Sequence, residues 1–147
     1  MGRVVALHGE LYAKEFGYDA GFEALVAGIV ARFVRDFDPK RERCWIAQKD
    51  GEVVGSVFLV RKSPAVSKLR LLIVSPKARG SGLGKRLTRA CIRFARRAGY
   101  RKMVLWTQSH LAAARSIYQA EGFRRVFSEK HRSFGKRLTA EVWELKL

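Results

Sequence analysis

Several residue types are scarce in this chain, and their scarcity excludes whole classes of protein. Only two of the 147 residues are cysteine, and Cys44 and Cys91 lie far apart without the spacing of a metal or redox site. A disulfide scaffold and a zinc cluster are therefore excluded, and we expect no bound metal and a reducing, cytoplasmic location. Only three residues are proline and 48% are apolar, which argues against a disordered chain.

Long apolar runs are missing as well. No run approaches the roughly 20 residues that span a bilayer, so we expect no membrane partner. The first residues carry a single charge and no cleavage-type region, so we expect no signal peptide. A length of 147 residues suits one domain with a sizeable core, and we expect residues 1–147 to form it.

Acidic residues are scarce too, and the middle of the chain has none. The chain has 30 Lys and Arg residues and only 13 Asp and Glu residues. The segment from Val53 to Ala120 contains fifteen basic residues and no acidic one. The resulting field attracts anionic partners in general, nucleic acid included. Phe94, Tyr100 and Trp106 lie near the basic run. We do not favour nucleic acid, because Phe94 and Trp106 fall on core positions rather than on an open stacking surface.

Hydrophobic patterning predicts four helices and seven strands. The strands are expected at residues 3–8, 43–49, 52–61, 66–74, 101–107, 123–129 and 139–147. The helices are expected at residues 9–16, 19–37, 82–98 and 109–121, with Asp19 and Ser109 as N-caps. We interpret Asp50-Gly51 as a hairpin turn and 130–138 as an irregular basic connection. The pattern predicts an α+β (α/β) fold whose mostly antiparallel sheet contains one parallel crossover, between Leu69 and Thr107.

The chain is organised around a glycine-rich loop between a strand and a helix, residues 79–84. N–H groups in the first turn of a helix have no partner in that helix, and the helix dipole is positive there, so the loop suits a pyrophosphate. A Walker A loop is excluded because Arg86 replaces the hydroxyl that follows Gly-Lys. A dinucleotide fingerprint is excluded because Arg79 replaces its first glycine and no acidic residue follows before Glu121. The spacing that fits is Arg-x-x-Gly-x-Gly, in which the glycines are Gly82 and Gly84.

The order of landmarks along the chain resembles the GNAT superfamily of N-acetyltransferases. These landmarks are Asp50–Gly55 (Asp-Gly-Glu-Val-Val-Gly), Val74–Pro76, Arg79–Gly84 and Ile117–Phe123 (Ile-Tyr-x-x-x-Gly-Phe). Three further segments resemble the acetyltransferase half of regulators fused to a MarR-type DNA-binding domain, namely Phe22–Val26, Ser133–Lys136 and Trp143–Leu145.

The resemblance implies a seven-stranded sheet flanked by about four helices, with splayed central parallel strands. It implies transfer of an acetyl group from acetyl-CoA, the cosubstrate, to a primary amine through a ternary complex. The pantetheine arm would pair with one strand edge, and the loop would bind the pyrophosphate. The residues implied to bind coenzyme A are Leu72, Ile73, Val74, Arg79, Gly80, Ser81, Gly82, Leu83, Gly84 and Lys85.

The same resemblance gives Tyr118 the role of general acid toward the departing thiolate, against the alternative of a packed aromatic residue. The chain departs from the family where several members carry a catalytic Glu, because Trp106 stands there, and Leu111 stands where an Asn commonly contacts the cofactor. The base therefore stays open among Glu15, His110 and His131. Glu15 is the candidate we retain, because the first helices flank the acceptor mouth in the family.

Two other functions remain open: a non-catalytic acyl-CoA sensor module of a transcription regulator, and a basic protein associated with nucleic acid. The sequence does not identify the acceptor. The positive charge argues against polycations and leaves small amines, amino acids and lysines with acidic neighbours. A homodimer is also left open.

Overall fold

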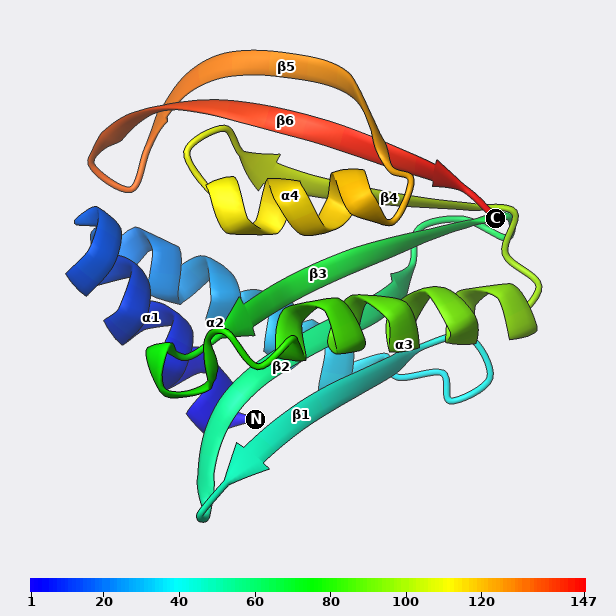
Figure 1. Cartoon of the computed structure of the whole chain (residues 1–147), viewed down its shortest axis with the longest axis horizontal. Coiled ribbons are helices and arrows are strands. Elements are labelled where there is room, and N and C mark those ends of the chain that lie inside the picture. Colours follow the sequence, from blue (N-terminus) through cyan, green and yellow to red (C-terminus); the bar gives the residue numbers. More distant parts are fainter.

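The computed structural model describes all 147 residues, and its centre is one six-stranded mixed sheet in the order β1-β2-β3-β4-β6-β5 (Figure 1). The helices are α1 (Gly2–Phe16), α2 (Ala20–Arg35), α3 (Leu83–Arg97) and α4 (Ala112–Ala120), with a short 3₁₀ helix η1 (Pro76–Ala78). The strands are β1 (Arg43–Lys49), β2 (Glu52–Arg61), β3 (Val66–Val74), β4 (Lys102–Gln108), β5 (Arg124–Ser133) and β6 (Lys136–Lys146). None of the helices is both long and apolar enough to cross a bilayer.

The strand predicted at residues 3–8 is wrong, because α1 runs unbroken from Gly2. Val4, His8 and Leu11 are the buried residues of this helix, and their spacing places them on one face. Val4 and Val5 favour a strand as isolated residues, but packing of that face against α2 and the sheet outweighs their preference. The sheet therefore has six strands where seven were expected.

Two other predicted boundaries are also wrong, and hydrogen bonds across the sheet explain both. The segment 130–138 is not irregular, because β5 and β6 form a long hairpin closed by Phe134 and Gly135, both with positive φ. Ser109 does not cap α4, because its N–H donates to Thr139 O at 2.9 Å and stays with the sheet. By contrast, the Asp50-Gly51 turn is confirmed, again with two positive φ angles.

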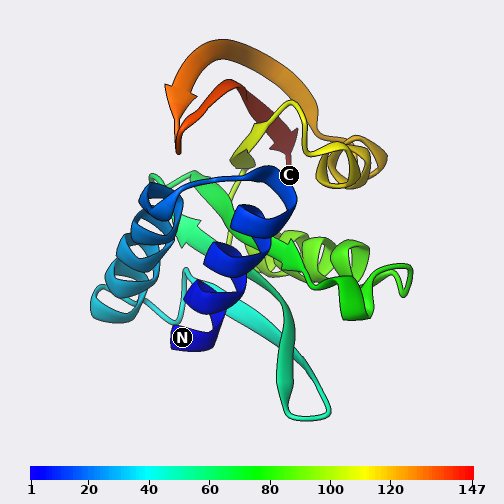
Figure 2. The same cartoon turned by 90° about the vertical axis from the view of Figure 1, so that its left-hand side faces the viewer.

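Helices cover both faces of the sheet, α1 and α2 on one and α3 and α4 on the other (Figure 2). The larger core lies under α3 and α4, and the smaller one lies between α1, α2 and β2. Gly55 on β2 allows α3 to pack closely, since a Cβ there would lie 3.0 Å from both Ile73 O and Leu83 Cδ2. This packing fixes the N-terminus of α3 beside the end of β3.

Candidate functional site

The two parallel strands separate in the middle of the sheet. β3 pairs with β4 only from Val66 to Leu69, opposite Lys102 to Leu105. Beyond that point β3 stays with β2, and β4 stays with β6 as far as Gln108. The predicted parallel crossover and splayed strands are thus both confirmed. The backbone edges that face the opening are free to pair with an extended ligand.

A β-bulge marks the point where β3 leaves its neighbour. The β2–β3 register shifts between Ser56 and Phe58, and Leu71 in the extra position has φ 55°. A left-handed conformation is costly for a residue with a Cβ, so it persists only where the surroundings hold it. Here the Ser56 hydroxyl, which is fully buried, donates to Leu71 O at 2.8 Å.

The loop after β3 presents six consecutive backbone N–H groups, those of residues 80–85, none of which donates to an acceptor in the protein. Gly82 is the N-cap of α3 with φ 77°, and Gly80 has φ 79°, conformations that a side chain would strain. Successive unpaired N–H groups at a helix N-terminus form a concave anion site. The predicted pyrophosphate site is therefore built from backbone, and Lys85 adds charge in the first turn of α3.

A cavity of about 530 Å³, the loop cavity, connects this loop to the opening between the strands. Nine of the ten residues expected to bind the cofactor line it: Leu72, Ile73, Val74, Arg79, Gly80, Gly82, Leu83, Gly84 and Lys85. Ser81 is the exception, because its hydroxyl donates to Ala78 O at 2.5 Å and closes the loop instead. Gly84 lets α3 pack closely against α4, since a Cβ there would lie 2.8 Å from Ile117 Cδ1 and that side chain would have to shift.

Glu15 also lines the loop cavity, at the C-terminal end of α1. Its Oε1 forms an ion pair with the Arg79 guanidinium at 2.5 Å. The pair links α1 to the glycine loop. A phosphate at the loop would therefore share Arg79 with Glu15.

A second cavity of about 350 Å³, the α2 cavity, lies on the other side of the opening, against α1 and α2. Tyr12, Leu72, Leu111 and Ala114 line both cavities, so the two meet at the splayed strands. The walls of the α2 cavity include six aromatic residues, namely Tyr12, Tyr18, Phe22, Trp106, Tyr118 and Phe134. A ligand in the loop cavity and a second molecule in the α2 cavity would therefore meet end to end.

Tyr118 lies on α4, where it lines the α2 cavity. It is 4% exposed and packs against Phe123 and Trp143, with ring centroids at 5.7 and 6.4 Å. Burial, followed by the nearby Tyr12 and Cys91, raises its pKa, and its hydroxyl has no hydrogen-bond partner in the protein. The phenol thus stays protonated, and it lies on the wall of the α2 cavity only.

The two other base candidates have different surroundings. His110 lines the loop cavity, and its Nε2 is 2.6 Å from the Tyr18 hydroxyl, while burial lowers its pKa. His131 lies on β5, bonded to Ser133 and Gln108, and lines neither cavity. The structure therefore brings Glu15 and His110 to the site and leaves His131 outside it.

Sequence reasoning missed His8, a wall residue of the α2 cavity. Its Nδ1–H donates to Val4 O at 2.8 Å, and its buried Nε2 has no partner. Burial lowers its pKa to about 4 despite that hydrogen bond, so the imidazole is neutral. The helical spacing of Val4, His8 and Leu11 was the available signal, which the strand interpretation of residues 3–8 concealed.

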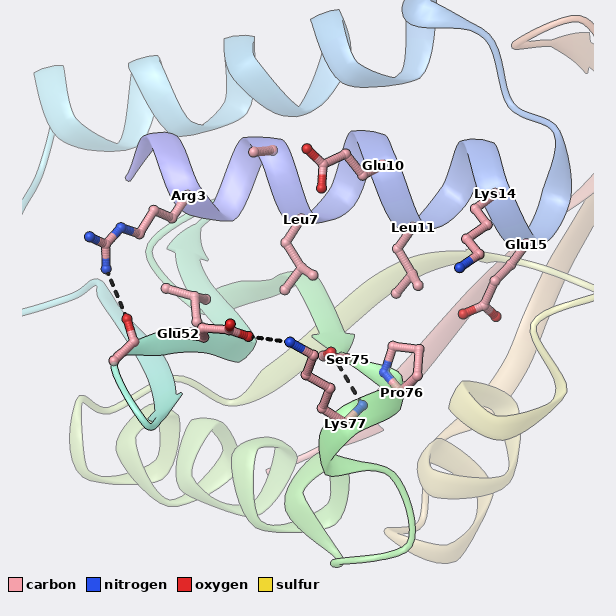
Figure 3. Close-up of a pocket in the computed structure, with 13 residues that line it drawn as sticks. Arg3, Leu7, Glu10, Leu11, Lys14, Glu15, Glu52, Ser75, Pro76 and Lys77 are labelled. Atoms are coloured by element: carbon pink, nitrogen blue, oxygen red, sulfur yellow. Dashed lines mark hydrogen bonds and ion pairs between the residues drawn. The ribbon is translucent and has the colours of Figure 1, made fainter.

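A larger groove of about 870 Å³ runs between α1 and the β1–β2 turn, on the far side of Leu11 and Glu15 (Figure 3). Some of its charged side chains have partners, since Lys77 pairs with Glu52 at 2.6 Å and Arg3 donates to Gly51 O at 3.2 Å, whereas Glu10 and Lys14 have none. It offers no run of unpaired backbone N–H groups like that of the loop. Size alone therefore does not identify the site, which lies where the strands separate.

Comparison with known proteins identifies the family of this chain. The model of the acetyltransferase (GNAT) family matches residues 9–123. The chain belongs to the acetyltransferase (GNAT) family. The unpaired N–H groups and the free strand edges of this GNAT chain suit an extended ligand that carries phosphate. In the described chain no three His, Cys, Asp or Glu side chains gather as metal ligands.

Two curated relatives illustrate the likeness. N-acetyltransferase family 8 member 2 of Rattus norvegicus is 40% identical over 87 residues, 56% of this GNAT chain. N-acetylaspartate synthetase of Danio rerio is 34% identical over 109 residues, 74% of this chain. The alignments cover 38% of each relative, so the chain spans well under half of their length.

Solved structures share the fold at lower identity. Ribosomal-protein-alanine N-acetyltransferase from Brucella melitensis superposes with a TM-score of 0.77 at 19% identity, covering 99% of this chain and 93% of that one. The yncA protein of Salmonella typhimurium, solved with acetyl-CoA, gives a TM-score of 0.75 at 20% identity and covers 99% and 87%. At such identities the likeness concerns the fold alone.

Proposed function

We propose that this chain transfers an acetyl group from acetyl-CoA to a primary amine, with both substrates bound at once and Tyr118 as general acid. The observation that carries the proposal is the meeting of two cavities at the splayed strands, one of them ending at six unpaired N–H groups. Such a site holds a diphosphate at one end and delivers a thioester to an amine at the other.

Different residues bind the pyrophosphate and the pantetheine arm of the cosubstrate. The N–H groups of residues 80–85 bind the pyrophosphate, with Arg79 and Lys85 supplying charge. The free edge of Leu72–Val74 pairs with the amide groups of pantetheine. A backbone N–H on that edge also polarises the thioester carbonyl and stabilises negative charge on its oxygen.

The transfer forms one bond and breaks one. The neutral amine attacks the carbonyl carbon, a C–N bond forms and the C–S bond breaks. Sulfur takes the Tyr118 proton, the excess amine proton leaves to a base, and the phenolate recovers a proton from solvent. Glu15, which lines the loop cavity and is ion-paired with Arg79, is the candidate base.

The first prediction concerns Tyr118→Phe, assayed by release of free thiol from acetyl-CoA with a panel of primary amines. Loss of the proton donor should lower kcat about 100-fold and leave the calorimetric affinity for coenzyme A unchanged. Tyr100→Phe is the matched control, because this buried phenol lines neither cavity and donates to Arg41 O. Glu15→Gln in the same assay tests the base.

The outcomes separate the functions. Tight binding of coenzyme A without turnover of any amine would indicate the acyl-CoA sensor, and absence of binding heat would overturn the site itself. Equal kcat for Tyr118→Phe and Tyr100→Phe would leave Tyr118 a packing residue. The MarR-fusion likeness, the cytoplasmic location, the homodimer and the less favoured nucleic acid remain predictions.

A further inference from the structure

Two basic side chains on β3, Lys68 and Arg70, line the α2 cavity without a partner. Both are partly buried, and neither forms an ion pair or a side-chain hydrogen bond within the protein. Burial, then Arg70 and Lys62, lowers the pKa of Lys68 to about 8, and burial followed by Arg32 lowers that of Arg70. The fold thus keeps two repelling cations partly out of water.

The acidic residues of the neighbouring groove have other hydrogen-bond or ion-pair partners. Asp36, Asp38 and Glu42 line the neighbouring groove that Lys68 and Arg70 also reach. Asp36 pairs with Arg32, Asp38 accepts from Lys40 N, and Glu42 accepts from the N–H groups of Asp38 and Arg61. No acidic side chain lines the α2 cavity itself. The protein therefore leaves the two cations without compensating charge on the cavity side.

The rest of the cavity wall is mostly apolar, and its other polar residues, His8, Thr107 and Gln108, are uncharged. Lys68 Nζ lies 5.9 Å from the centre of the Trp106 ring, and the neutral His8 adds no charge. The expected core position of Trp106 is wrong, because its side chain is half exposed. Rings of this kind bind the flat body of a small molecule, and a volume of about 350 Å³ lies within the range of small-ligand sites. A cationic body would meet two like charges and no carboxylate, so the walls disfavour it.

We propose that Lys68 and Arg70 bind a carboxylate on the acceptor, so that the acceptor is a small amine with an apolar body and an acidic group. The inference rests on the proposed acetyl transfer and names its substrate class. The amine lies where the cavities meet, at Leu72 and Tyr12, and the carboxylate lies farther along β3. Arg70 suits the role because its guanidinium binds a carboxylate through two parallel hydrogen bonds.

The test compares acceptors that differ only in the acid. One pair is 4-(2-aminoethyl)benzoate and the corresponding benzamide, and the other is phenylalanine and its amide. With saturating acetyl-CoA, thiol release gives kcat/KM for each. We expect the acid of at least one pair to exceed its amide about tenfold to 100-fold, because hydrogen bonds between charged groups contribute more than neutral ones.

Variants assign the preference to its residues. Lys68→Met and Arg70→Met should raise KM for the preferred acid about tenfold and leave kcat/KM for the matched amide nearly unchanged. Lys62→Met is the matched control, because this exposed lysine lines only the neighbouring groove and removes the same charge. Arg70→Lys should restore part of the preference. A structural defect would instead lower activity on acid and amide alike.

The failures of the two proposals are distinguishable. Absence of thiol release with every amine overturns the acetyl transfer. Turnover in which acids and amides are equal in both pairs, or in which the amides are better, overturns the carboxylate site and leaves the transfer intact. A preference for the acid that survives in both methionine variants overturns the assignment to Lys68 and Arg70.

Discussion

At the scale of single residues, His8 couples the α2 cavity to the stability of the chain. Its side chain is almost fully buried, one nitrogen donates to Val4 O, and the other has no partner. A charged imidazole would therefore lose its hydration with no anion to compensate it. The consequence is a pKa of about 4, well below the ordinary 6.5.

This shift predicts that acid destabilises the protein through His8. The pKa is lower in the folded state, so His8 contributes its full stability above pH 6.5 and loses it as the pH falls toward 4. A shift of this size corresponds to about 3 kcal/mol. Urea unfolding should show that the free energy of unfolding of wild type falls by about this amount more than that of His8→Leu over the same range.

His131→Gln is the control for the acid experiment. His131 has hydrogen-bond partners for both ring nitrogens, so its replacement should leave the steep decline of wild type in place. If the curves of wild type and His8→Leu ran parallel between pH 6.5 and 4, the imidazole would already be solvated or paired, and the neutral His8 described above would be wrong.

At the scale of elements, the opening between β3 and β4 depends on the bulge at Leu71. Its carbonyl accepts from the buried Ser56 hydroxyl at 2.8 Å, and the extra residue turns the strand away from β4. Ser67, equally buried on the paired part of β3, donates to Lys102 O at 3.2 Å. The two serines make the same kind of bond on either side of the point where the strands separate.

The comparison of Ser56→Ala with Ser67→Ala tests whether this bulge shapes the site. Each should lose about 1 kcal/mol of stability, the contribution of one hydrogen bond. Only Ser56→Ala should also raise KM for acetyl-CoA, about threefold to tenfold, because the unpaired edge of Leu72–Val74 loses its position. Equal KM values in the two variants, at equal loss of stability, would show that the strands separate without help from Ser56.

The sequence could predict features that depend on neighbouring residues in the chain, but not those that depend on contacts between distant segments. The glycine loop is local, since Gly82, α3 and the end of β3 are neighbours in the chain, and it was predicted with nine of ten residues on the cavity wall. The α2 cavity was not predicted, because Lys68, Arg70 and His8 meet only after β3 and α1 pack together. The predicted strand at residues 3–8 is wrong for the same reason. Val4 is β-branched, but its burial against α2 decides its conformation.

At the scale of the whole molecule, the net charge of +17 favours the approach of the polyanion that we propose as cosubstrate. Several arginines on α3, among them Arg93 and Arg97, have no ion-pair partner and extend the positive field from the glycine loop along the helix. Charges along α3 attract a ligand at the glycine loop only where salt does not screen them. The Debye length is about 30 Å at 0.01 M salt and about 8 Å at 0.15 M.

Affinity for acetyl-CoA should therefore depend on salt through charges that never touch it. Between about 10 and 300 mM salt, kcat/KM for acetyl-CoA should fall about tenfold. Acetylpantetheine, which lacks the phosphates, should show almost no dependence. Arg93→Gln combined with Arg97→Gln should flatten the acetyl-CoA profile at low salt and coincide with wild type at high salt, because the screened field no longer reaches the loop. If acetylpantetheine showed the same slope as acetyl-CoA, salt would be acting on the protein rather than on attraction of the diphosphate.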